Sequence, residues 1–118
     1  MPPTVLIVDD HPSFRASARA ILEAEGFVVI GEAIDGAGAI LAAGELHPDV
    51  LLLDVQLPDM TGFDVCEAVC RMNGTAPAVV LVSSREAADY GDLIDGSGAC
   101  GFVAKHELSG EAVAALLP

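Results

Sequence analysis

The sequence predicts an α/β domain in which a parallel sheet carries helices on both faces. Apolar runs of strand length alternate with segments of helical period along the whole chain. The 118 residues suit one domain, and 53% are hydrophobic but only 4% aromatic, so aliphatic residues and alanine fill its core. Strands that alternate with helices pair in parallel. The strands are expected over residues 4–8, 27–30, 49–54, 78–82 and 100–104.

The first two helices are predicted from their starts and their apolar faces. A helix over residues 12–25 follows the first strand, with Pro12 in its first turn and apolar residues at helical spacing. A second helix over 36–45 is expected to begin after Asp35, whose carboxylate can accept hydrogen bonds from first-turn N–H groups.

The third strand and helix carry the clearest local signals. The strand over 49–54 is apolar from its second residue up to Asp54, which is typical of a strand covered on both faces. Thr61 and Asp64 then have the spacing of a capping box, which predicts a helix over 62–72.

The last two helices complete a set of five within one domain over residues 1–118. The helix over 86–95 has the poorest helix-forming sequence, because Gly91 interrupts it, and Tyr90 is expected to be half exposed. Ser109 is expected to cap the final helix.

Composition excludes several classes of function. The net charge is −13, from 18 acidic and 5 basic residues, so the chain should repel nucleic acid and anionic membranes. No apolar stretch reaches the roughly 20 residues that span a bilayer. The first residues carry no basic group and lead directly into a strand, so we expect no export signal and a cytoplasmic location.

Polar residues follow four of the apolar strands. Asp9 and Asp10 follow the first, Asp54 ends the third, Ser83 follows the fourth, and Lys105 follows the fifth. In a parallel α/β sheet the functional crevice lies beyond the carboxyl ends of the strands. The sequence therefore predicts one site at that edge.

These residue types suit phosphoryl chemistry with a divalent metal. Three converging carboxylates ionise together at low cost only beside a cation, and oxygen ligands point to Mg²⁺ or Mn²⁺. One carboxylate, that of Asp54, is then free to attack a phosphoryl group and form an acyl phosphate. Lys105 can neutralise charge, while the Ser83 hydroxyl and the Ser84 backbone N–H can donate hydrogen bonds to the phosphoryl oxygens.

The chain resembles, over essentially all 118 residues, the receiver domain of bacterial two-component response regulators. The matching segments are Val8-Asp9-Asp10, Leu53 to Gly62, Ser83-Ser84, and Gly98 to Lys105. The resemblance implies a flavodoxin-like, doubly wound sheet of five strands in the order 2-1-3-4-5. The run from Asp9 to Arg15 is similar to the subgroup that precedes LuxR-type helix-turn-helix output domains.

The resemblance also implies roles for single residues. Asp54 would be the phosphoacceptor, supplied by a sensor histidine kinase or a phosphotransfer protein. The metal would be held by Asp10, Asp54 and the backbone carbonyl of Gln56, with Asp9 acting through a water. Ser83 would be the switch hydroxyl and Phe102 its aromatic partner. Lys105 would supply the counter-charge for the phosphate, and Gln56 and Arg85 would tune phosphate lifetime.

One position departs from the family pattern. Many receivers have proline after the lysine, often with a cis peptide bond, and His106 stands there instead. A cis bond before a residue other than proline costs about 3 kcal/mol. We therefore expect a trans bond or a strained loop between Lys105 and His106.

The sequence leaves two hypotheses of function open. In the first, phosphorylation switches the face formed by the helix over 86–95, the last strand and the last helix, and the domain is no enzyme beyond slow self-phosphorylation from small donors and self-dephosphorylation. In the second, the domain binds partners independently of phosphorylation. A phosphatase is disfavoured, because Gln56 occupies the position of its second acid. The chain is either a stand-alone receiver or a piece of a longer transcription regulator, and a homodimer is possible.

Overall fold

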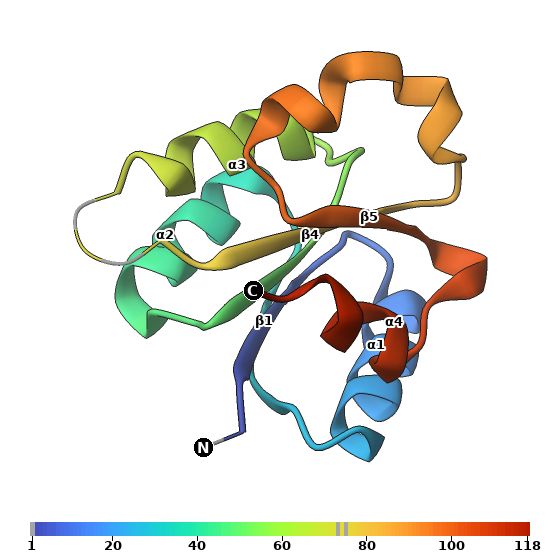
Figure 1. The fold of residues 1–118 in the computed structure, drawn as a ribbon. Coiled ribbons are helices and arrows are strands. Elements are labelled where there is room, and N and C mark those ends of the chain that lie inside the picture. Colours follow the sequence, from blue (N-terminus) through green and yellow to red (C-terminus); the bar gives the residue numbers. More distant parts are fainter. Residues whose placement is uncertain (1, 73, 75) are drawn as a thin grey trace.

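The computed structural model describes residues 2–72, 74 and 76–118, and it contains one five-stranded parallel sheet. The strand order is β2-β1-β3-β4-β5, which confirms the flavodoxin-like prediction (Figure 1). The strands are β1 (Thr4–Val8), β2 (Val28–Ala33), β3 (Val50–Asp54), β4 (Ala78–Ser83) and β5 (Gly101–Ala104).

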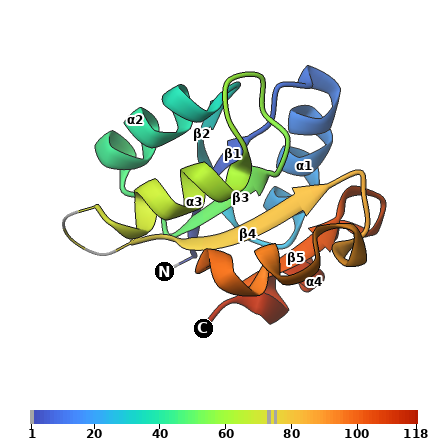
Figure 2. The same ribbon diagram turned by 90° about the horizontal axis from the view of Figure 1, so that it is seen from above.

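In the described part of the chain, four α-helices cover the two faces of this sheet, with α1 and α4 on one side and α2 and α3 on the other (Figure 2). They are α1 (Pro12–Ala24), α2 (Gly36–Leu46), α3 (Gly62–Cys70) and α4 (Gly110–Leu116). The predicted caps are confirmed. The side chains of Asp35 and Ser109 accept hydrogen bonds from first-turn N–H groups, and Thr61 and Asp64 form the capping box.

The strands separate the core into two layers by simple alternation. Val5 and Ile7 of β1 pack with α1 and α4, whereas Leu6 and Val8 pack with α2 and α3. All four side chains are fully buried. Burial of one such side chain stabilises the fold by about 1.5 to 3 kcal/mol. The central strands are therefore held from both sides, and their carboxyl ends form a firm edge.

The predicted helix over 86–95 is wrong as an α-helix. This stretch forms two 3₁₀ helices, η1 (Ala87–Leu93) and η2 (Asp95–Ser97). Gly91 breaks the first at φ 56° and ψ −129°, a backbone conformation that side-chain-bearing residues rarely adopt. The segment passes over α3 and β5 instead of continuing as a regular helix (Figures 1 and 2).

The other differences from prediction are small. β2 extends to Ala33, three residues past its expected end at 30, because its pairing with β1 shifts register between Val5 and Leu6 and then continues. α3 ends at Cys70, two residues before the expected 72. The described residues contain no cis peptide bond, so the bond between Lys105 and His106 is trans as expected, within the short 3₁₀ turn η3 (Lys105–Glu107). Among the described helices, none has the length and apolar character that a membrane crossing requires.

Candidate functional site

The predicted site residues meet at the carboxyl edge of the sheet. Asp9 and Asp10 follow β1, Asp54 ends β3, Ser83 ends β4, and Lys105 follows β5. Within the described part of the chain, the buried polar or charged residues are Asp9, Asp54 and Ser83. Burying a carboxylate is costly unless the site provides a partner for it. The fold therefore concentrates its buried polarity at one place.

Lys105 is the cation of this cluster. Its Nζ lies 2.6 Å from Asp9 Oδ2 and 3.4 Å from Asp54 Oδ2. The same ammonium stands 4.5 Å from the centre of the Phe14 ring on α1, a cation–π contact. Phe14 thus supports the ammonium from the helix side while the two carboxylates attract it toward the sheet edge.

The Asp54 carboxyl is hard to ionise in this setting. Burial raises its pKa from 3.8 to about 6, and the neighbouring charge of Asp9 acts in the same direction. Lys105 and the Gln56 backbone N–H, which donates to Asp54 Oδ1 over 3.3 Å, lower the pKa and offset part of this rise. Two buried carboxylates share one lysine, so the site is short of positive charge.

The ligand atoms present fit a divalent cation. Single atoms from Asp9, Asp10, His11 and Asp54 all lie within 4.8 Å of one another. Asp9 Oδ2 is buried and faces the Lys105 ammonium at 2.6 Å, with no other hydrogen-bond partner among the described residues. This oxygen keeps lone pairs for a cation, and oxygen donors of this kind suit Mg²⁺ or Mn²⁺.

Two neighbours of the acids were given no role in the predicted site. His11, at the start of α1, has its Nδ1 3.0 Å from Asp9 Oδ1 and 3.1 Å from Asp10 Oδ1. Arg15 Nη1 donates to the backbone carbonyl of Asp9 over 2.8 Å, and Arg15 Nε pairs with Glu32 on β2 over 2.9 Å. The two lie four residues apart at the start of α1, next to the acids in sequence. That spacing is the one signal that could have found them.

The loop after Asp54 is fixed by contacts that sequence reasoning also missed. The Asp59 carboxylate accepts hydrogen bonds from the first N–H groups of α2, at Gly36 (2.7 Å) and Ala37 (3.0 Å), and these bonds lower its pKa. A Cβ on Gly62 would lie 2.4 Å from the Asp54 backbone oxygen, so only glycine fits there. The Asp59 hydrogen bonds and the close approach at Gly62 therefore fix the path of this loop.

Ser83 is held by a residue that was not singled out for the site. Its Oγ lies 2.6 Å from the hydroxyl oxygen of Tyr90 on η1, and it accepts the Arg85 backbone N–H over 3.1 Å. Tyr90 is half-buried, as expected, and its ring packs against Phe63 (5.7 Å between centroids) and Phe102 (5.9 Å). Ser84 and the Arg85 side chain are exposed.

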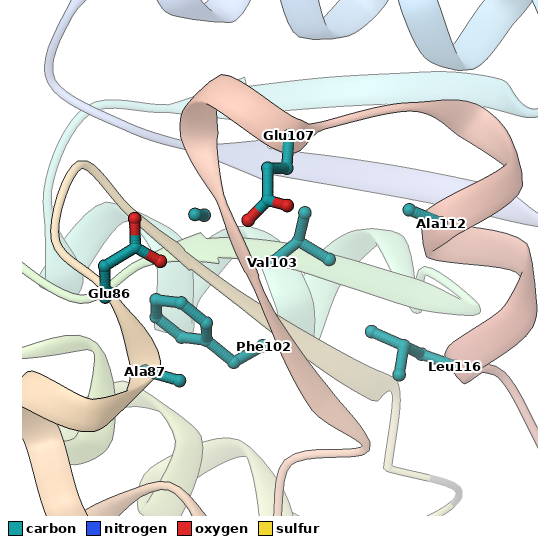
Figure 3. Close-up of a pocket in the computed structure, with 8 residues that line it drawn as sticks. Glu86, Ala87, Phe102, Val103, Glu107, Ala112 and Leu116 are labelled. Atoms are coloured by element: carbon teal, nitrogen blue, oxygen red, sulfur yellow. The ribbon is translucent and has the colours of Figure 1, made fainter.

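A cavity of about 390 Å³ lies beside this aromatic group, between η1, β5, η3 and α4. Figure 3 shows the Phe102 ring near Ala87, with the carboxylates of Glu86 and Glu107 gathered on one side of it. Leu116 of α4 lies across the cavity from them. The cavity has an apolar wall with acidic groups at its rim.

Comparison with known proteins gives consistent matches. The response regulator receiver domain family matches residues 5–117. The chain is 43% identical over 102 residues to the nitrate/nitrite response regulator protein NarP of Escherichia coli, covering 86% of this chain and 47% of NarP. The chain thus spans about half the length of the curated relatives it matches.

Two solved structures show the same fold. The signal receiver domain of the Mycobacterium tuberculosis response regulator NarL is 32% identical, with a TM-score of 0.85 over 98% of this chain and 96% of that one. A LuxR-family two-component response regulator from Aurantimonas is 26% identical, with a TM-score of 0.87 over 98% of this chain and 83% of that one.

Proposed function

Because this chain belongs to the response regulator receiver domain family, we propose that it is a signalling switch driven by phosphorylation of Asp54. One observation supports this most strongly. A buried carboxylate with a raised pKa stands beside a second buried acid and a single lysine at the carboxyl edge of the sheet. Such a site has a nucleophile and a shortage of positive charge, which is what an incoming phosphoryl group with its metal would complete.

The proposed reaction is a transfer between two proteins. An Asp54 carboxylate oxygen attacks the phosphorus of a phosphohistidine on a sensor kinase or phosphotransfer protein. A P–O bond forms as the P–N bond breaks, and the histidine nitrogen keeps the electron pair and takes a proton. Lys105 neutralises charge on the phosphoryl oxygens, and Ser83 and Ser84 donate hydrogen bonds to them.

The metal site we propose consists of Asp9, Asp10, Asp54 and the backbone carbonyl of Gln56. Bound there, Mg²⁺ or Mn²⁺ would supply the positive charge that the carboxylates and the phosphoryl oxygens require. Lys105 alone does not neutralise the acids, because its single positive charge is shared between Asp9 and Asp54.

The output surface we propose is the face of η1, β5 and α4, where the acidic-rimmed cavity lies. Its partner would be a downstream protein or an output domain, since this chain matches only 47% of NarP, and the setting would be the cytoplasm. Regulation of transcription would pass through that output domain, and a homodimer is a further arrangement of the switched state. Gln56 and the exposed Arg85 would tune phosphate lifetime, and the domain's own chemistry would be limited to slow self-phosphorylation and self-dephosphorylation.

Incubation with acetyl phosphate and Mg²⁺, followed by intact mass spectrometry, tests the function. The wild type should gain one phosphoryl group, Asp54→Asn should gain none, and chelation of the metal should prevent the gain. A wild-type chain that gains nothing under these conditions and from a competent kinase would contradict the proposal.

The second candidate is a partner-binding module that does not use the phosphate. It is favoured by the broken η1 helix and by His106 in place of proline. Equal partner binding by the wild type and Asp54→Ala, with and without acetyl phosphate, would support this alternative over phosphorylation.

A further inference from the structure

The Ser83 hydroxyl is nearly saturated in this structure. An oxygen of this type has one proton and two lone pairs. The Arg85 backbone N–H occupies one lone pair over 3.1 Å. Tyr90 Oη, at 2.6 Å, engages the proton or the other lone pair. Ser83 is 1% exposed, so no bulk water competes for it. If Ser83 donates its proton to Tyr90, a phosphoryl oxygen on Asp54 could receive that proton only after the Tyr90 bond changed.

Tyr90 cannot simply follow a displaced Ser83. Its ring has an edge-on contact with Phe63 of α3 and a tilted contact with Phe102 of β5, at 5.7 and 5.9 Å. A move of the phenol oxygen therefore requires a move of the whole ring against both neighbours. Gly91, the next residue, is where η1 leaves helical geometry, and it provides a place for such a shift.

Phe102 lacks a hydroxyl and therefore cannot bond to Ser83. It contacts Tyr90 on one side, and Figure 3 shows it lining the cavity between η1, β5 and α4. Tyr90 and Phe102 together therefore connect Ser83 to the cavity. Tyr90 supplies the bond to Ser83, and Phe102 carries any displacement to the cavity.

We propose that Tyr90 is a positioning residue that holds the Ser83 hydroxyl in its resting orientation and must release it when Asp54 receives a phosphoryl group. This inference rests on the proposed function. It predicts that the Tyr90 hydroxyl opposes occupation of the phosphoryl site, and that its release changes the cavity beside Phe102.

The chain offers a direct reporter, because it contains one tyrosine and no tryptophan. Tyrosine emission from the wild type therefore comes from Tyr90 alone. Beryllofluoride with Mg²⁺ is titrated into the wild type, Tyr90→Phe, Ser83→Ala and the double variant, with binding measured by calorimetry. We expect Tyr90 emission to change in step with binding in the wild type. We expect Tyr90→Phe to bind about fivefold tighter, the effect of losing one competing hydrogen bond.

The Ser83→Ala background separates this role from a structural one. Removal of the Tyr90 hydroxyl should alter affinity by less than about twofold there, because its partner is gone. The same fivefold gain in that background would overturn the proposal, as would weaker or unchanged binding by Tyr90→Phe. Thermal unfolding checks that each variant is folded.

Ser83→Ala also provides a second test that does not use Tyr90→Phe. Without beryllofluoride, its Tyr90 emission should already resemble that of the bound wild type, and emission equal to the free wild type would overturn the proposal.

The calorimetry separates a failure of the proposed function from a failure of the proposed role of Tyr90. Absence of binding heat in the wild type would remove the proposed function, and this inference with it. Normal binding heat with unchanged Tyr90 emission would remove only the role of Tyr90.

Discussion

The two halves of the site are held in different ways. The acidic half consists of Asp9, Asp10, Asp54 and Lys105, and the hydroxyl half consists of Ser83, Tyr90 and the segment η1–η2. α3, which follows the acidic half, buries Gly62, Val65, Cys66 and Val69, whereas no residue of η1 or η2 is buried. Well-packed elements open rarely, and poorly packed ones open often. The acidic half is therefore suited to fixed chemistry, and the hydroxyl half to movement.

The difference also concerns what links each half to the fold. In the acidic half Lys105 is paired with two carboxylates, Arg15 bonds the Asp9 carbonyl, and Asp59 bonds the start of α2. In the hydroxyl half one hydroxyl pair and two ring contacts connect Tyr90 to its surroundings. A signal can change the second set at low cost, while the first set stays in place.

Lys105→Met should have the largest effect on stability, because it leaves Asp9 and Asp54 buried without their cation. Removing one partner of a buried pair costs about 4 kcal/mol in unfolding free energy. Urea unfolding near pH 7 without metal measures it, and His106→Ala, at an exposed neighbouring position, is the control. A loss below about 1 kcal/mol would show that the acidic half is not held by this pairing.

Asp54→Asn should make the metal-free protein more stable at neutral pH. The folded-state pKa of Asp54 is about 6, above the ordinary 3.8, so the folded state binds this proton more tightly than the unfolded state. The stability that the Asp54 proton gives the folded wild type is fully present below about pH 4 and is lost as the pH rises through about 6. Relative to its value well below pH 4, the difference in unfolding free energy between variant and wild type should reach about 3 kcal/mol at about pH 7.5.

Mg²⁺ provides the control for that pH series. If the wild-type acids bind the ion, saturating Mg²⁺ should remove most of the advantage of Asp54→Asn near neutral pH. A difference that does not vary with pH would contradict the burial and charge that we assign to Asp54.

Gly62→Ala should destabilise the loop of the acidic half by about 2 kcal/mol, because its Cβ would meet the Asp54 backbone oxygen at 2.4 Å. Gly96→Ala in η2 is the matched control, since a Cβ there would meet nothing within 4 Å. We expect that control to change stability by less than about 0.5 kcal/mol. Equal effects of the two variants in thermal unfolding would break the contrast between the halves.

Arg15→Gln should have the smallest effect. It removes the bond to the Asp9 carbonyl and the pairing with Glu32, and Arg15 is 16% exposed. We expect a loss of about 1 kcal/mol and weaker Mg²⁺ binding, as followed by calorimetry. Arg19→Gln removes a more exposed pairing with the same glutamate and should leave Mg²⁺ affinity unchanged. Identical metal affinities of the two variants would show that Arg15 does not position Asp9.

Much of the fold and of the acidic half could be predicted from the sequence. The central strands β1, β3 and β4 contain continuous apolar runs, and Asp35, Thr61 and Ser109 cap helices through hydrogen bonds to residues three positions away, so these features are local. The meeting of Asp9, Asp54 and Lys105 followed from one rule, that parallel strands end at one edge of the sheet.

The tertiary structure alone decided how the site is braced and where it can move. The bonds of Tyr90 to Ser83, Arg15 to Asp9 and Asp59 to α2 depend on side-chain orientation and on how the elements pack. Gly91 marked the segment after β4 as a poor helix, but not its 3₁₀ form. Local free energies determine caps and strands, whereas contacts between distant residues depend on a global packing minimum that residue type and spacing do not determine.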